Sequence, residues 1–465
     1  MTSVFFERFA FYGIRWALVL YFVLQLNGGD STAQTEANLI YSSYLALLYA
    51  AAIIGGLIAD RLLGHRTALA MGAVLMACGI FTLLIPDPIT FKYGLAAIVV
   101  GNGLYKPTIA AQVSKLFDSD SGRDSGFTIF HMAVNAAGLI GPFATQYMAT
   151  KLFGTRNGAV FEVVFFAAGI SMALSLLCFS IGKGAVSDTP LSKKQWAYSL
   201  ALLTALILVA NFLLHLDGTE MMILLVLVFL AALPLLVIES LQDGKFGRNK
   251  MFVLFSIFVL NTVFWAIFEY AGSSVNLLAI NFANFDGADS LLTSTMLSGV
   301  TLFALIVSAP LLALLWLSLA RYQIDFLTLR KFCIGVILIA VSFAILMSCV
   351  STLLSGEYKI SPWPFMLVFL LHALGELCIA PIGLSLVSKF APVKLVGLAI
   401  GCWYFSTSLG TRLAGVLAGF ISGNSEPNLA SFLFEYQFAF YSFLFLGILL
   451  FIGTPYIYHC SMKRG

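Results

Sequence analysis

The sequence predicts an all-α membrane protein with fourteen spanning helices, arranged as two bundles of six and an extra pair between them. Of its 465 residues, 60% are hydrophobic and 10% are charged, whereas soluble proteins have about 45–50% and about 25%. Apolar runs long enough to cross a bilayer, about 20 residues each, recur with short polar connections between them. This composition excludes a soluble enzyme.

The apolar runs give the positions of the spans. Six are expected near 1–26, 36–59, 66–86, 91–114, 126–151 and 160–182, and six more near 251–280, 291–319, 331–353, 362–389, 394–421 and 435–458. Between these sets, segments near 195–215 and 219–240 are also long and apolar enough to span. We therefore expect a first bundle in 1–183, the extra pair with its linkers in 184–250, and a second bundle in 251–465.

The charge distribution predicts an orientation in the lipid bilayer. The formal charge of +3 is spread over many short loops, so no basic patch indicates a nucleic-acid partner. Basic residues such as Arg61, Arg66 and Arg248 fall in one set of loops, while Asp30 and Glu36 fall in the opposite set. Because basic loops stay in the cytoplasm, we expect a multi-pass protein of the cell inner membrane with both termini cytoplasmic.

Several charges lie inside the predicted spans. A charge near the centre of a span costs at least about 2.5–3.5 kcal/mol, so it is expected to face a cavity or a partner. Complementary charges on two bundles can close a gate and reopen it when a proton or a substrate competes for one partner. The alternative is that they only hold helices together. These residues are Glu7, Arg8, Arg15, Lys106, Glu269, Glu376 and Arg412.

Six motifs, in this order, resemble those of the proton-dependent oligopeptide transporter family, a branch of the major facilitator superfamily. The resemblance covers nearly the whole chain, and the extra central pair is similar to that of many bacterial members. The motifs are FERFAFYG at 6–13, GGLIADRLLGHR at 55–66, GNGLYKPTIA at 101–110, GRDSGFTIFHMAVNAAG at 122–138, FWAIFEYAGSS at 264–274 and GELCIAPIGLSLVSKFAP at 375–392.

The resemblance implies proton-coupled symport of di- and tripeptides by alternating access, with a small peptide as substrate, the proton as coupling ion and no cofactor. We expect the chain to act as a monomer. The implied peptide pocket consists of Arg8, Tyr12, Tyr49, Lys106 and Asn135 on the first bundle, and of Trp265, Glu376 and Trp403 on the second. Glu376 would receive the peptide's amino group. Arg15–Glu269 and Lys106–Glu376 would form cross-bundle gates. The family pattern assigns no role to Arg412.

Two departures from the family pattern concern the coupling of transport to protons. Val4 stands where the first-helix motif has its first glutamate, which leaves only Glu7 there, and His131 replaces the usual tyrosine. We therefore expect Glu376 to carry the coupled proton, with Glu269 or Glu7 as alternatives. The alternative function is transport or facilitated diffusion of another small zwitterion or anion.

Three smaller patterns have structural explanations, and the sequence carries no catalytic pattern. GNG at 101–103 lies inside an apolar span, so close helix packing explains it better than nucleotide binding. Asp60 and Arg61 end a span and predict either cytoplasmic gating by contacts between helix ends or a simple turn with a charged anchor. His372 and Glu376 lie one turn apart without a third ligand, so no metal site is expected. No nucleophile and base are evident at membrane depth, so the sequence predicts no catalytic residues and no enzyme.

Overall fold

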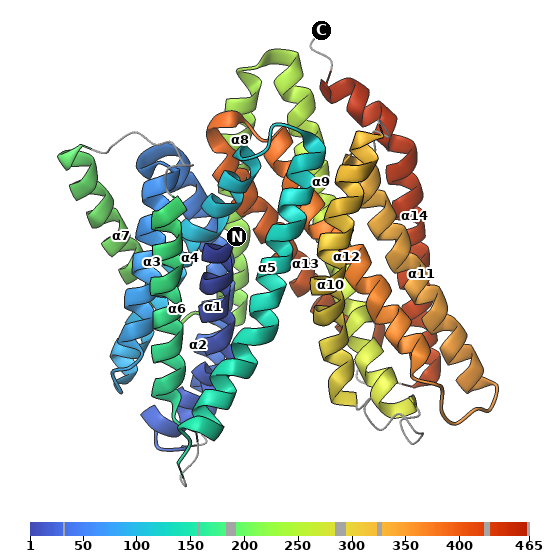
Figure 1. The fold of residues 1–465 in the computed structure, drawn as a ribbon, viewed down its shortest axis with the longest axis horizontal. Helices are drawn as coiled ribbons and strands as arrows, with labels where there is room; N and C mark the ends of the chain where they lie inside the picture. The colour runs from blue at the N-terminus through green and yellow to red at the C-terminus, as the bar shows by residue number, and fades with distance from the viewer. Residues whose placement is uncertain are drawn as a thin grey trace. The chain divides into compact units, whose positions relative to one another are not determined.

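The computed structural model describes residues 1–30, 33–155, 159–182, 192–283, 294–322, 328–422 and 428–462. Each of the fourteen predicted spans corresponds to one long helix (Figure 1), so the predicted fold class is confirmed. The helices are α1 (Thr2–Tyr21), α2 (Ala33–Ile58), α3 (His65–Thr82), α4 (Pro88–Lys115), α5 (Asp120–Tyr147), α6 (Phe161–Gly182), α7 (Lys193–Leu213), α8 (Gly218–Leu241), α9 (Gly244–Phe282), α10 (Ser294–Arg321), α11 (Thr328–Leu354), α12 (Trp363–Phe390), α13 (Val396–Ser422) and α14 (Leu429–Met462).

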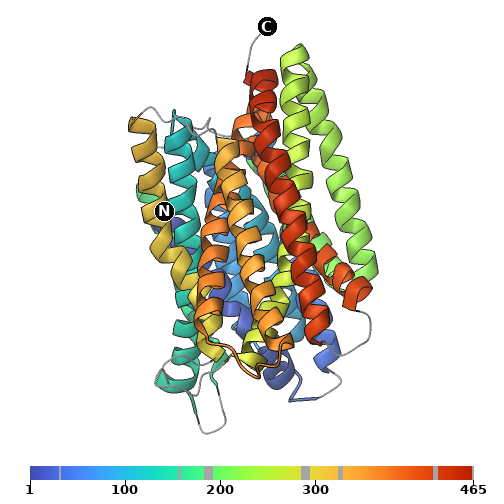
Figure 2. The same ribbon diagram turned by 90° about the vertical axis from the view of Figure 1, so that its right-hand side faces the viewer.

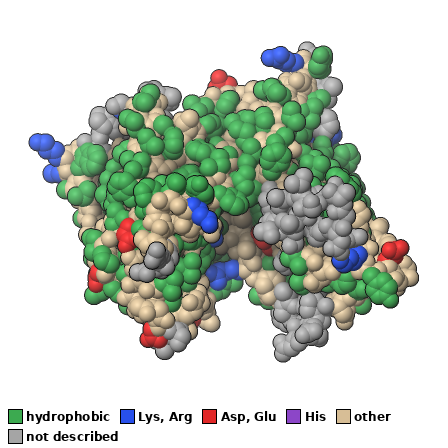
Figure 3. All heavy atoms as spheres, turned by 60° about the horizontal axis from the view of Figure 1, so that its bottom comes forward, with side chains coloured by type: hydrophobic (Ala, Val, Ile, Leu, Met, Phe, Trp, Pro, Cys, Tyr) green, Lys and Arg blue, Asp and Glu red, His purple; other side chains and the backbone are tan. Residues whose placement is uncertain are grey.

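The outer surface of these helices is apolar. Large hydrophobic side chains such as Phe143, Phe252 and Ile452 are exposed, and hydrophobic side chains are spread widely over the face seen in Figure 3. Thirteen of the described helices are long and apolar enough to cross a membrane, and α4, which carries Asn102 and Lys106, is not among them. A helix with polar groups at membrane depth needs other helices around it.

By packing, the chain forms two compact units. The first comprises Met1–Leu116, Ala136–Gly247 and Ala391–Phe405, and the second comprises Phe117–Asn135, Arg248–Phe390 and Ser406–Gly465. Helices α5 and α13 therefore each contribute residues to both units, while the extra helices α7 and α8 belong to the first. The division into 1–183, 184–250 and 251–465 stays a prediction, and its boundary near 183 lies outside the described residues.

In the first unit, α4 is the central helix. It packs against α2, α3 and α7, while α8 packs against α2. A Cβ atom built on Gly55 would lie 2.1 Å from the carbonyl oxygen of Gly103, and one on Gly72 would lie 2.8 Å from that of Gly101. Side chains at these positions would push the helix backbones apart. The predicted packing role of GNG is therefore confirmed.

The beginning of α13 packs against α2 in the same way, through glycines that let the helix backbones approach closely. A Cβ atom on Gly401 would lie 2.4 Å from the carbonyl oxygen of Ala52, and one on Gly56 would lie 2.4 Å from that of Gly397. Since only glycine allows this approach, residues 391–405 pack as part of the first unit.

In the second unit, α11 packs against α12 and α14, and α10 packs against α12. Helix α14, red in Figure 2, runs beside α11, where the rings of Phe343 and Phe443 stack at 5.9 Å between centroids. Asn261 Nδ2 joins α9 to α13 by donating to Ser406 Oγ at 2.8 Å and Thr407 Oγ1 at 2.9 Å. Aromatic packing and buried amide bonds thus fix the helices of this unit.

We predict that Gly55→Ala lowers the melting temperature of the purified protein, because overpacking of this kind costs about 1–3 kcal/mol. Gly272→Ala is the matched control, since it also lies inside a helix but a Cβ atom there would meet nothing within 4 Å. Equal melting temperatures for the two variants in one detergent would contradict the close packing of α2 and α4.

Candidate functional site

In the first unit, the charges predicted on α1 form a buried network. Arg8 Nε donates to Glu7 Oε2 at 2.6 Å, and both side chains are buried. Asn102 Nδ2 of α4 donates to Glu7 Oε1 at 3.4 Å. The acid and the base therefore stabilise each other within the span, and the amide of α4 holds the carboxylate in place.

Aromatic rings face the cations of this unit. Lys106 Nζ lies 4.1 Å from the centroid of Tyr404 and 4.9 Å from that of Tyr49, and the Arg8 guanidinium lies 5.0 Å from the Phe11 ring. Such contacts stabilise a cation while leaving its N–H groups available to an anion. Sequence reasoning identified Tyr49 but missed Tyr404, although it directly follows the predicted Trp403.

The remaining predicted residues in this unit lie on α1 and α13. Arg15 Nε donates to Tyr41 Oη at 3.2 Å, and the Tyr12 ring lies against Gly138 of α5, where a Cβ atom would be 3.5 Å away. Trp403 is buried. Most of the predicted first-bundle residues are thus brought together within one compact unit.

In the second unit, Glu376 of α12 meets His131 of α5, with 3.1 Å between Glu376 Oε1 and His131 Nε2. One turn along α5, Asn135 Nδ2 donates to the backbone carbonyl of His131 at 2.9 Å. Sequence reasoning noted His131 only as a departure and missed it as a partner of Glu376. The available signal was its spacing of four residues from Asn135, which places both on one helix face.

Other predicted residues of the second unit lie around this pair. Glu269 of α9 is exposed and interacts electrostatically with Glu376. Trp265 Nε1 is buried and has no hydrogen-bond partner among the described residues. His372 packs between Phe268 and Phe343, with ring centroids 5.1 and 5.4 Å away. The pairs Arg15–Glu269 and Lys106–Glu376 have one member in each unit and stay predictions.

Comparison with known proteins decides the family. The chain matches the POT family over residues 66–430. It belongs to the POT family. It is 29% identical over 446 residues to the peptide transporter YePEPT of Yersinia enterocolitica subsp. palearctica serotype O:3 (strain YE-P4), covering 90% of this chain and 86% of that protein.

Further POT family relatives agree in length and fold. The chain is 29% identical over 436 residues to dipeptide and tripeptide permease B of Photorhabdus asymbiotica subsp. asymbiotica (strain ATCC 43949 / 3105-77), covering 90% of this chain and 86% of that protein. It is similar to the crystal structure of a POT family transporter in complex with a thioalcohol-conjugated peptide, with a TM-score of 0.66, 26% identity and coverage of 98% and 95%.

This POT family chain also carries polar contacts at helix ends. In the first unit, Asp60 accepts hydrogen bonds from the backbone N–H groups of Gly397 at 3.1 Å and Leu398 at 2.8 Å. A carboxylate at the beginning of a helix is favoured by the unpaired N–H groups there. Contacts between helix ends, one of the two readings of this motif, are confirmed, while a gating function stays a prediction.

In the second unit, the beginning of α5 is tied to α11. Lys331 Nζ contacts Asp124 Oδ2 at 2.5 Å, with both side chains buried, and it lies 5.0 Å from the ring of Trp316. Lys389 of α12 pairs with Asp120 of α5. Sequence reasoning missed both pairs, because charges near span ends have the same pattern as anchors of membrane orientation.

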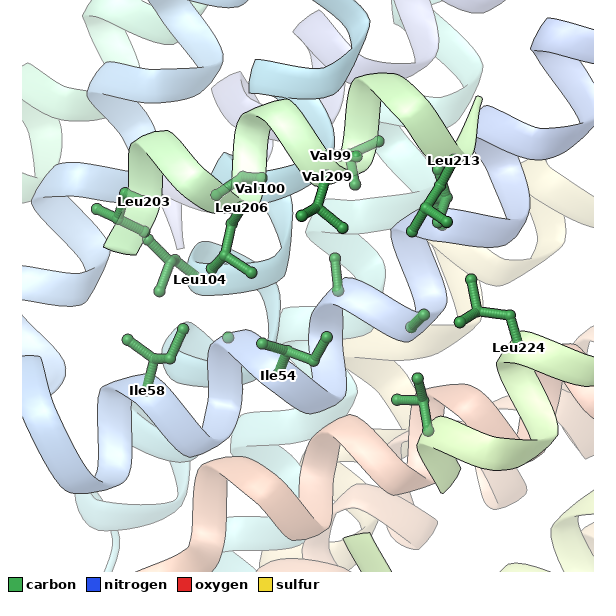
Figure 4. A pocket seen from close by; sticks show the side chains of 16 residues that line it. Ile54, Ile58, Val99, Val100, Leu104, Leu203, Leu206, Val209, Leu213 and Leu224 are labelled. Carbon is green, nitrogen blue, oxygen red and sulfur yellow. The ribbon is translucent and has the colours of Figure 1, made fainter. Parts of the chain in front are cut away.

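A cavity of about 180 Å³ lies between α2, α4, α7 and α8. Figure 4 shows side chains such as Ile54, Leu104, Leu206 and Leu224 around it, and every lining residue is apolar. Because a charged or zwitterionic solute needs polar partners, this cavity is not the candidate site.

We predict that Asp124→Asn lowers thermal stability strongly, since breaking a buried ion pair leaves Lys331 uncompensated at a cost of about 3–5 kcal/mol. The double variant Asp124→Asn/Lys331→Met should recover most of the loss, because it removes the stranded charge. Asp120→Asn is the control on the same helix, as its carboxylate is 43% exposed. Melting temperatures that fall equally for Asp124→Asn and Asp120→Asn would refute the buried pair.

Proposed function

We propose that this chain imports di- and tripeptides together with protons by alternating access. Relatives are named as a peptide transporter and as dipeptide and tripeptide permeases, and the chain is a transporter, not an enzyme. It is a multi-pass membrane protein. We expect it to work as a monomer in the cell inner membrane, with both termini in the cytoplasm.

The observation that carries the proposal is the division of charge between the two units. The first unit presents Arg8 and Lys106 against aromatic rings, and the second presents Glu376 with Glu269 in electrostatic range. A peptide at neutral pH carries a carboxylate at one end and an ammonium group at the other. Charge-assisted hydrogen bonds at both ends would bind such a molecule in one orientation.

Each end of the peptide is assigned to one unit. The carboxylate binds Arg8 and Lys106, whose aromatic contacts leave N–H groups free to donate. The ammonium group binds Glu376. We expect the other predicted residues to contact the peptide as well, namely Tyr12, Tyr49, Asn135, Trp265 and Trp403.

The coupled proton is assigned to Glu376. Val4 cannot ionise, and Glu7 is already engaged by Arg8 and Asn102. Among the described residues of its unit, Glu376 has the imidazole of His131 as its polar side-chain partner, so its carboxylate is available to take up a proton. A group that meets both proton and substrate ties the two binding events together.

We predict that Arg8→Ala and Lys106→Ala abolish dipeptide uptake by proteoliposomes, because each removes a cation for the peptide carboxylate. Lys92→Ala is the matched control on α4, because Lys92 is paired with Glu36 at 2.9 Å. This variant should transport like the wild type. Undiminished uptake by Lys106→Ala would show that this lysine is not part of the site. Absence of competition by any peptide would contradict peptide transport itself.

We predict that Glu376→Gln loses accumulation driven by a proton gradient but keeps some counterflow, because the amide can still accept hydrogen bonds and cannot release a proton. Proton-driven accumulation and counterflow are measured in liposomes for this variant, for Glu269→Gln and for Glu7→Gln. Proton-driven accumulation that survives in Glu376→Gln would move the coupling site to one of these two carboxylates.

A further inference from the structure

The apolar cavity between α2, α4, α7 and α8 has the chemistry of a site for a hydrocarbon. Its volume is about 180 Å³, and every residue that lines it is apolar. Figure 4 shows side chains from all four helices around the space. Water fills a cavity only where polar groups bind it, whereas an apolar cavity of this size stays dry and accepts an apolar ligand. A ligand of this cavity is therefore expected to be a hydrocarbon.

The residues that line the cavity extend along the helices. On α2 they run from Leu47 to Ile58, and on α7 they run from Leu203 to Leu213. At 1.5 Å per residue, these stretches are about 15–17 Å long, which is about half of the roughly 30 Å hydrocarbon core of a bilayer. One acyl chain of one leaflet has this reach. Another spanning helix, about 10 Å wide, is too large for this volume.

The cavity is accessible from the lipid side of the protein. Val209 of α7 lines the cavity and is 51% exposed, which indicates that the cavity opens at the surface. Most residues in the apolar stretches of α7 and α8 are not buried within the protein. Helix α7 packs against α4, while α8 packs against α2. An acyl chain can therefore enter from the bilayer without crossing water.

One end of the cavity points toward basic and aromatic side chains. Ile58 and Leu203 lie close to each other at this end in Figure 4. Toward the beginning of α7, Leu203 is preceded by the exposed side chains of Lys193, Lys194 and Trp196. Tryptophan at the end of a span lies at the level of the lipid headgroups, and lysine there attracts anionic lipids. The headgroup is therefore expected beside the beginning of α7.

We propose that this cavity binds one acyl chain of an anionic phospholipid, with the chain along α2 and α7 and the headgroup beside Lys193 and Lys194. The lipid would supply apolar contacts between the extra helices and α2 and α4. This inference concerns lipid binding, so it does not depend on which solute the protein transports.

The test is a titration of the purified full-length protein, freed of lipid in detergent, with palmitoyl-oleoyl-phosphatidylglycerol, and native mass spectrometry measures the bound lipid. Val209→Phe should weaken the tightest binding step by about tenfold, since the ring takes the place of about two methylene groups of the chain. Leu208→Phe is the matched control, because Leu208 is an exposed neighbour on α7 that does not line the cavity. Equal affinity for the wild type and Val209→Phe would overturn the inference.

The headgroup is tested with palmitoyl-oleoyl-phosphatidylcholine, which has the same chains and no net charge. It should bind the wild type about fivefold or more weakly, as expected for the loss of attraction to one lysine. Equal affinities for the two lipids would overturn the placement of an anionic headgroup beside Lys193 and Lys194.

Photocrosslinking of the wild-type protein decides the question even if Val209→Phe does not fold. The probe is a phosphatidylglycerol with a diazirine group in the middle of one acyl chain. It should label Ile54 of α2, which lies across the cavity from α7 in Figure 4. Labels on α7 that are confined to Leu208 and Phe212, which are exposed and do not line the cavity, with none on Ile54, would overturn the inference.

Discussion

A charge inside a bilayer has no water to solvate it, so each charged side chain within these helices needs a partner from the protein. The structure meets this requirement in different ways. Glu7 and Arg8 pair along one helix, Lys331 and Asp124 pair between helices, and Lys106 faces aromatic rings. A fully buried pair between two helices, such as Lys331 with Asp124, is suited to hold those helices together. The groups with replaceable partners are suited to exchange them for a substrate or a proton.

That difference separates structural charges from functional ones. Asp124 and Lys331 are almost completely buried, so neither can be released without stranding the other. Glu376 keeps some exposure beside His131, and Lys106 is held by ring faces. The buried pair of Asp124 and Lys331 is therefore expected to stabilise the fold. Glu376 and Lys106 are expected to take part in transport.

The sequence predicted the helices well, because the apolar length needed to cross a bilayer leaves a strong pattern even where charges interrupt it. It also predicted the close packing at Gly101 and Gly103, since glycines spaced along a span allow helix backbones to meet. The contact of Asp60 with α13 followed in the same way from a carboxylate at a helix end.

Partners between helices could not be predicted. Pairing of His131 with Glu376, of Asp124 with Lys331, and of Lys106 with Tyr404 depends on how each helix is rotated about its axis, which apolar runs do not specify. Helix α4 was nevertheless predicted as a span, although it is not among the thirteen helices that are apolar enough by hydropathy alone.

The central claim is that peptide and proton move together. The most direct measurement uses proteoliposomes adsorbed on a solid-supported membrane, with the same pH inside and outside the liposomes. The current is recorded when dialanine is added outside. The account predicts an inward positive current that requires the peptide, because a zwitterion carries no net charge and the proton supplies it. Peptide uptake without any current, or a complete absence of peptide-dependent flux, would contradict it.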